Sequence, residues 1–139
     1  YSVDSSINMT CSITDELSGI ASKECENVER PAYEFELGIN KVTATATDNA
    51  GNTAKVDIQF TVIVDFDSLS RLTEDFVTKK EVAHSLTEKL QSAKESAVKG
   101  NNKAKIGQLN AYENQLNAQS GKSITDQQAN ILISLLGKL

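Results

Sequence analysis

The apolar residues of this chain change their spacing once, close to residue 65, and this change restricts the fold more than any other feature. Before it, apolar and polar residues alternate, which is the period of a strand with one buried face. After it, apolar residues recur every three or four positions, as in an amphipathic helix. The spacing therefore predicts an α+β chain of two separate domains: an all-β domain over residues 1–65 and an all-α domain over residues 66–139.

The charge of the chain changes at the same place. Residues 1–65 hold eleven acidic and four basic side chains, a net charge of −7, whereas residues 66–139 hold eight and ten, a net charge of +2. The change of sign supports the division into two domains. Neither part is basic enough to predict nucleic-acid binding, and the apolar runs are too short to cross a bilayer. We therefore expect no nucleic-acid partner and no membrane insertion.

Alternation predicts several strands in the first domain. They cover residues 7–13, 33–37, 42–46 and 56–64. Turn sequences rich in Asp, Asn, Ser and Gly separate some of these runs, and strands at this spacing favour an antiparallel sandwich of immunoglobulin type. About 65 residues are few for such a sandwich. Since the chain also lacks an initiating Met, we expect it to be a fragment whose missing edge strand lies upstream of residue 1.

Two cysteines, Cys11 and Cys25, lie in the first domain. A bond between them would close a loop of 15 residues, worth about 3 kcal/mol in the chain-entropy model. A small β domain with little core gains from such a cross-link, so the spacing predicts a disulfide formed in an oxidising compartment. The alternative is a pair of reduced, half-buried thiols.

Amphipathic segments predict four helices in the second domain. Their apolar stripes cover residues 69–77, 82–97, 106–116 and 131–136. Ser68 is a candidate N-cap and Gly100 a candidate C-cap, and Thr125 with Gln128 has the pattern of a capping box. Short loops between such helices favour a four-helix antiparallel bundle. We expect Leu109 to belong to its core.

Two segments of the first domain carry a resemblance to a known family. They are the run C-S-I-T-D-E-L-S-G-I over residues 11–20, followed by Cys25, and the run A-T-D-N-A-G-N-T over residues 46–53. With them, residues 1–64 resemble bacterial immunoglobulin-like repeats related to the HYR group. The resemblance implies a sandwich whose last two strands form a hairpin around Asn49–Asn52. It also implies a spacer or adhesive role without catalytic residues.

The second domain carries a resemblance of its own. It rests on Phe76-Val77 and on the runs K-G-N-N-K-A at 99–104, L-N-A-Y-E-N-Q-L at 109–116 and N-A-Q-S-G-K at 117–122. These residues resemble the FIMAH domain, a helical module at the C-termini of bacterial extracellular proteins. Its pattern has Phe and an aliphatic residue where this chain has Tyr112 and Glu113. The resemblance implies an accessory domain of exported enzymes, with no chemistry of its own to transfer.

Three groups of polar residues are candidates for sites. Asp48, Asn49 and Asn52 offer oxygen atoms that calcium accepts, although the same residue types are what a hairpin turn requires. The basic residues Lys94, Lys99, Lys103 and Lys105 could form a patch that binds anionic polymer, although lysine is also favoured at helix C-termini. His84 is the only histidine, and its neighbour Ser85 would lie on a different helix face, so we expect no catalytic pair and no cofactor.

These observations favour a non-catalytic accessory module from the end of a larger secreted protein. In one hypothesis the module tethers or positions an upstream domain of the same polypeptide at a cell surface or substrate, with cell-wall polymer or polysaccharide as its ligand. In the other it is purely a structural spacer and C-terminal cap that serves stability or export. An enzyme is the least favoured interpretation. The possible paired carboxylates, Glu34 and Glu36, share the outer face of a predicted strand without a predicted cleft.

Overall fold

The computed structural model describes all residues 1–139. The chain divides into two compact units. The β unit comprises Tyr1 and Ser5–Ile63, and the helical unit comprises Ser2–Asp4 and Val64–Leu139. Asp4 pairs with the Arg71 guanidinium within the helical unit, which ties the short segment before the first strand to the helices.

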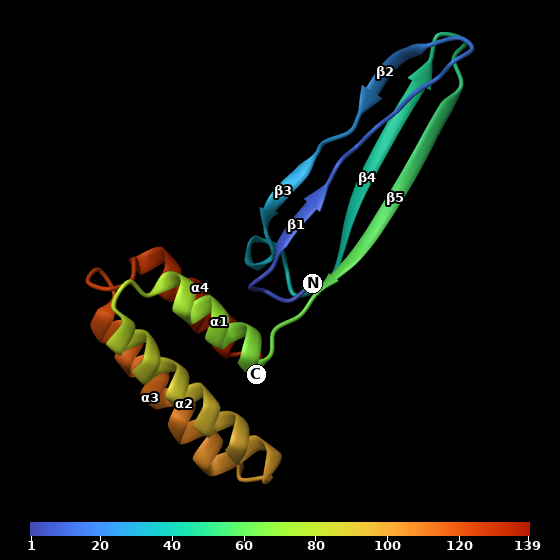
Figure 1. Cartoon of the computed structure of the whole chain (residues 1–139). Coiled ribbons are helices and arrows are strands. Elements are labelled where there is room, and N and C mark those ends of the chain that lie inside the picture. Colours follow the sequence, from blue (N-terminus) through green and yellow to red (C-terminus); the bar gives the residue numbers. More distant parts are fainter. The chain divides into compact units, whose positions relative to one another are not determined.

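The β unit consists of two antiparallel sheets (Figure 1). Its elements are β1 (Ser6–Met9), β2 (Ile20–Glu24), β3 (Val28–Pro31), the 3-10 turn η1 (Ala32–Glu34), β4 (Gly38–Asp48) and β5 (Thr53–Val62). β1 pairs with β3, and the second sheet has the order β2-β4-β5. Four helices follow the strands, so the predicted fold class, an all-β domain before a four-helix domain, is confirmed.

The β4–β5 hairpin is the longest pairing in the β unit. Its register runs without interruption from Gly38 opposite Val62 to Thr47 opposite Thr53. Because side chains alternate along a strand, one face of the hairpin is apolar and the other is polar. On the polar face, the Asp57 carboxylate lies 2.8 Å from the Lys41 ammonium and accepts a 2.7 Å hydrogen bond from the Thr43 hydroxyl. These partners, Lys41 first, lower the pKa of Asp57.

Two of the predicted strands are corrected by the structure. Residues 33–37 do not form a strand: the Ala32 N–H bonds to the Ser5 carbonyl, and the Phe35 N–H bonds back to the Ala32 carbonyl, closing a 3-10 turn. The strand predicted over 7–13 ends at Met9, since the Cys11 N–H donates to the Asn27 side chain instead of a neighbouring strand.

The structure also contains two strands that the pattern did not reveal. In β2 four of the five side chains are exposed, and in β3 two of the four. Neither strand shows the alternation of one buried face. Strands like these give no periodic signal, because the alternation that identifies a strand comes from burial of one face.

The helical unit contains α1 (Phe66–Phe76), α2 (Lys80–Val98), α3 (Asn102–Gln119) and α4 (Asp126–Leu136). Each helix packs against the helices before and after it in the chain. α4 also packs against α1, and this contact closes the four-helix bundle. The largest fully buried side chains of the helices are Leu69, Leu86, Leu90, Tyr112, Leu116 and Leu132. None of the helices combines the length and hydropathy that a membrane span requires.

Tyr112 makes the one side-chain hydrogen bond between helices in this core. Its hydroxyl lies 2.7 Å from the Thr73 hydroxyl, and both residues are buried. Because the Thr73 hydroxyl donates its proton to the Leu69 carbonyl, it accepts the hydrogen bond that the Tyr112 hydroxyl donates. Burial raises the pKa of Tyr112 well above its usual range. The tyrosine that departs from the FIMAH pattern is therefore accommodated by a threonine on α1.

The capping predictions for α1 and α2 need adjustment. Asp65, not Ser68, is the N-cap of α1. Its carboxylate accepts the Ser68 N–H at 2.7 Å, and the Ser68 hydroxyl accepts the Asp65 N–H at 3.0 Å, so the expected cap residue is the second half of a capping box. These bonds lower the pKa of Asp65. The C-cap of α2 is Lys99, followed by Gly100 with φ 70°.

The capping box that opens α4 is confirmed. The Gln128 N–H donates to the Thr125 hydroxyl, and the Thr125 N–H donates to the Gln128 side chain, both at 3.2 Å.

Leu109, which the sequence placed in the core, is only partly buried. α2 and α3 have 19 and 18 residues, whereas α1 and α4 have 11 each. Helices of 11 residues cannot cover the full length of the α2–α3 pair.

These burials predict the effect of truncating leucine and isoleucine side chains in α3. Leu116 is fully buried, whereas Ile106 is 56% exposed. We expect Leu116→Ala to lower the free energy of unfolding of the helical unit by about 2–5 kcal/mol, and Ile106→Ala to change it by less than about 1 kcal/mol. Urea denaturation followed by helical circular dichroism measures both. Equal losses in the two variants would contradict the assigned faces of α3.

Candidate functional site

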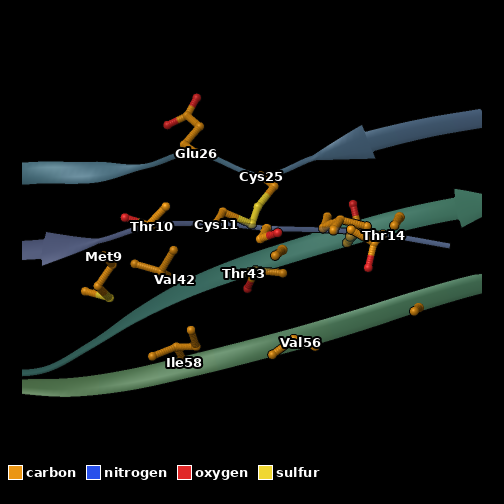
Figure 2. A pocket seen from close by; sticks show the side chains of 16 residues that line it. Met9, Thr10, Cys11, Thr14, Cys25, Glu26, Val42, Thr43, Val56 and Ile58 are labelled. Carbon is orange, nitrogen blue, oxygen red and sulfur yellow. A yellow bond between two sulfur atoms is a disulfide. The ribbon is translucent and has the colours of Figure 1, made fainter. Parts of the chain in front are cut away.

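The β unit contains an apolar groove of about 440 Å³. One wall is the apolar face of β4 and β5, and the other is the segment that follows β1 together with the disulfide (Figure 2). Its principal lining residues are Met9, Cys11, Ile13, Val42, Val56 and Ile58. Val56 is 58% exposed and Ile58 is 49% exposed, so this face of the hairpin is only partly covered.

The disulfide lies at this groove. Cys11 and Cys25 are bonded, as the sequence predicted. The bond holds the segment after β1 against the chain that leads from β2 into β3, on the opposite side of the groove from Val56 and Ile58 (Figure 2). Its two sulfur atoms therefore close one wall of the groove.

The chemistry of the groove suits an apolar ligand. Besides aliphatic side chains it is lined by hydroxyl groups, and Glu26 is its one ionisable side chain. The remaining lining is aliphatic or carries hydroxyl groups, so most of the groove suits contact with apolar groups.

Hydrogen bonds join the two turns that carried the family resemblance. The Asn49 side chain donates to the Ser18 carbonyl at 2.6 Å, and the Asn49 N–H donates to the Gly19 carbonyl at 3.1 Å. Asp15 accepts the Leu17 N–H and the Ser18 hydroxyl at 2.9 Å each, and these bonds lower its pKa. We call this arrangement of residues 15–19 and 48–52 the loop junction. It explains why the first turn has Asp, Ser and Gly and the second has Asp, Asn and Gly at these positions.

The three calcium candidates lie in the loop junction and bond within it. The Asp48 carboxylate accepts the Asn52 N–H at 2.8 Å and the Asn52 side-chain amide at 2.9 Å. The Asn52 bonds lower the pKa of Asp48. Asn49 directs its side-chain amide to Ser18. No three His, Cys, Asp or Glu side chains gather closely enough to hold a metal ion.

The four candidate lysines differ in their surroundings. Lys94 pairs with Asp67 at 2.6 Å, and the Lys105 ammonium donates to the Leu139 carbonyl at 2.7 Å and lies 5.9 Å from the centre of the Phe66 ring. Lys99 and Lys103 are exposed and take part in no ion pair. Both flank Gly100 at the turn between α2 and α3. The patch is thus reduced to the two lysines of this turn.

His84 is exposed and lies on α2. Its Nε2 is 3.2 Å from the Glu88 carboxylate, one helical turn further on. The neighbouring Ser85 hydroxyl donates to the Gln115 side chain, and Gln115 also accepts the Lys89 ammonium at 2.8 Å. The serine is therefore part of a contact between α2 and α3. The structure does not bring His84 and Ser85 together.

Lys89 and Gln115 form a polar contact that sequence reasoning missed. The Lys89 ammonium also bonds the Ser85 hydroxyl and carbonyl. Ser85 and Lys89 stand one turn apart on α2, as their spacing in the sequence indicates. Their shared partner Gln115 lies on α3, and this contact depends on the packing of the two helices. The contact uses neutral oxygen atoms as acceptors, so it fixes the α2–α3 pair without a carboxylate.

Comparison with protein families agrees with this geometry. A family model of the FIMAH domain matches residues 66–139, and one of the HYR domain matches residues 5–64. The chain belongs to the FIMAH family. Its β unit is a HYR domain placed directly before the FIMAH domain. No curated protein and no solved structure matches the chain. Both resemblances that the sequence motifs carried are therefore confirmed, in the predicted order.

The HYR domain should lose stability when its disulfide is opened. The bond closes 15 residues in sequence, and the Cys11→Ala/Cys25→Ala variant should lower the free energy of unfolding of the HYR domain by about 3 kcal/mol. Thiol labelling in denaturant checks the bond itself: no label before reduction and two after it. Helical circular dichroism of the FIMAH domain serves as the control and should be unchanged. Two labelled thiols before reduction would contradict the bond.

The loop junction predicts an interaction between two positions far apart in sequence. Gly19 has φ 74°, and a Cβ placed there would lie 3.2 Å from the Asn49 side-chain nitrogen; Gly51 has φ 89° and open space. Either glycine-to-alanine change should cost about 1–2 kcal/mol from the positive φ. Gly19→Ala should cost more, and the excess should disappear in an Asn49→Ala background. Chemical denaturation of Gly19→Ala, Gly51→Ala, Asn49→Ala and Gly19→Ala/Asn49→Ala measures these free energies of unfolding. If the excess cost of Gly19→Ala is the same without the Asn49 side chain, the contact between positions 19 and 49 is contradicted.

Proposed function

We propose that this chain is a non-catalytic accessory module of a larger exported protein, which tethers or positions an upstream domain of that protein at a cell surface or substrate. The observation that carries the proposal is the order of its domains: a HYR and a FIMAH domain follow each other directly. Both families are typically accessory modules of larger proteins. The disulfide supports an extracellular location, since such bonds persist in oxidising compartments.

The chemistry of the side chains supports a binding role. The groove has one ionisable side chain, and His84 pairs with a glutamate on its own exposed helix face. An anionic polymer such as a cell-wall polyanion is the ligand that Lys99 and Lys103 favour. Two exposed ammonium groups on either side of the α2–α3 turn attract repeated negative charges, and this attraction falls with added salt.

The alternative function is a structural spacer and C-terminal cap. The cross-linked HYR domain and the capped helices of the FIMAH domain provide two stable units, which is all that a spacer needs. A spacer would have no affinity for polymer. The two functions therefore differ in one measurable property, the binding of the chain to an insoluble anionic wall preparation.

A sedimentation assay separates the two functions. We expect the chain to co-sediment with bacterial cell walls that retain their anionic polymer, and to stay in solution after that polymer has been removed. Lys99→Gln/Lys103→Gln should weaken binding by about tenfold, since two ion contacts of roughly 0.7 kcal/mol each would be lost.

The matched control removes the same charge elsewhere. Lys79→Gln/Lys80→Gln changes two exposed lysines at the other end of α2 and should leave binding nearly unchanged. Equal losses in both variants would indicate an effect of net charge alone. No sedimentation of the unaltered chain would favour the spacer.

A further inference from the structure

The two large apolar side chains that the helical unit exposes lie at one end of the α2–α3 pair. Val98, the last residue of α2, is 83% exposed, and Ile106, in the second turn of α3, is 56% exposed. The other exposed large apolar residues of the chain belong to the β unit. Single apolar residues are ordinary on a protein surface, but these two share one end of a domain. We call residues 98–106 the α2–α3 tip.

The α2–α3 tip extends past the two shorter helices (Figure 1). Lys94 pairs with Asp67 in the first turn of α1, and Lys105 bonds to the carbonyl of Leu139, which follows α4. These contacts mark how far α1 and α4 cover the longer pair. Val98 follows Lys94 by one helical turn. It therefore lies beyond this cover, and no neighbouring helix buries it.

The α2–α3 tip joins these apolar residues to cations without an acid among them. Residues 96–112 contain no Asp or Glu and are the longest such stretch of the chain. Lys99 follows Val98 directly. Lys103 precedes Ile106 by three residues, which places both side chains on one face of α3. The tip thus presents apolar groups beside positive charges.

Hydrogen bonds within the chain fix the shape of the tip. The Asn101 N–H bonds to the Ser96 carbonyl at 2.8 Å, and the Asn101 side chain accepts the Ala104 N–H at 3.1 Å. The carboxylate that precedes the tip, Glu95, accepts the Gln91 amide at 3.1 Å and forms no ion pair with a lysine. The backbone of the tip is therefore ordered, and its two unpaired lysines are available to a ligand.

We propose that the α2–α3 tip binds the surface of an anionic lipid bilayer. Its two unpaired lysines attract the negative headgroups, while Val98 and Ile106 enter the boundary between headgroups and acyl chains. A polymer that offers only charge leaves this apolar pair in water, so a lipid surface matches the tip more fully. The contact is shallow and needs no helix that spans the membrane. The inference rests on the proposed function, because it uses the same lysines, and adds the apolar contact.

Vesicle flotation of the full chain tests the inference. We expect the chain to float with vesicles of equal parts phosphatidylglycerol and phosphatidylcholine, and not with phosphatidylcholine alone. Val98→Gln/Ile106→Gln should weaken binding to the anionic vesicles about tenfold. It should leave sedimentation with lipid-free cell walls that keep their anionic polymer unchanged. Lys99→Gln/Lys103→Gln should weaken both kinds of binding, and helical circular dichroism verifies that each variant is folded.

A fluorescent reporter tests which residues enter the bilayer surface. The chain contains no Trp, so Val98→Trp places a single indole at the tip. Leu17→Trp is the matched control, because Leu17 is 98% exposed and belongs to the β unit. The emission of Val98→Trp should move to shorter wavelength on anionic vesicles, and that of Leu17→Trp should not. Equal shifts in the two variants overturn the assignment of the tip.

The two assays separate the lipid surface from the polymer. An unaltered chain that does not float with anionic vesicles overturns the inference. So does a Val98→Gln/Ile106→Gln variant that floats as well as the unaltered chain. In both cases wall sedimentation would still support the proposed polymer ligand. Flotation that depends on the apolar pair, without any wall sedimentation, would support the inference and overturn the polymer as ligand.

Discussion

The long antiparallel pairing of β4 with β5 is the interaction on which the HYR domain depends. It is the only pairing that extends through ten consecutive residue pairs without a bulge. β2 adds to its other side over a short and irregular stretch, and β1 and β3 form a separate sheet of two strands. Two-stranded pairings are marginally stable by themselves. The loop junction holds the turn before β2 to this hairpin, and the disulfide ties the segment after β1 to the chain that leads from β2 into β3.

The disulfide and the loop junction act at different places. The Cys11–Cys25 bond ties the segment after β1 to the chain ahead of β3, at the wall of the groove. The loop junction joins the turn before β2 to the turn between β4 and β5. Each continues a strand pairing beyond its end, since Met9 lies opposite Val28 and Ile20 lies opposite Asp48. Both use residue types fixed by geometry: cysteine for the covalent bond and glycine where φ is positive.

Sequence reasoning recovered the elements whose burial is periodic. β4, β5 and the four helices each place their apolar residues on one face, so these residues recur at a measurable spacing even where the face is only partly covered. It missed β2 and β3, whose side chains are mostly exposed, and it extended a strand through η1, where Tyr33 and Phe35 alternate with glutamates but the backbone turns. Of the candidate sites, the disulfide followed from two cysteines alone. The pairing of Lys94 with Asp67 and of Lys89 with Gln115 depends on helix packing, which spacing within one segment cannot reveal.

Asp65 has a consequence for how these domains travel between proteins. It lies between the two family matches, which end at residue 64 and begin at residue 66, yet its carboxylate caps the first helix of the FIMAH domain. When the FIMAH domain is joined to a different neighbour, the residue at this position therefore affects the stability of α1. A recombined neighbour that does not supply Asp, Asn, Ser or Thr as its last residue would lose this cap, at a cost of about 1 kcal/mol. The first helix of the FIMAH domain thus depends on one residue, Asp65, that lies outside the family match.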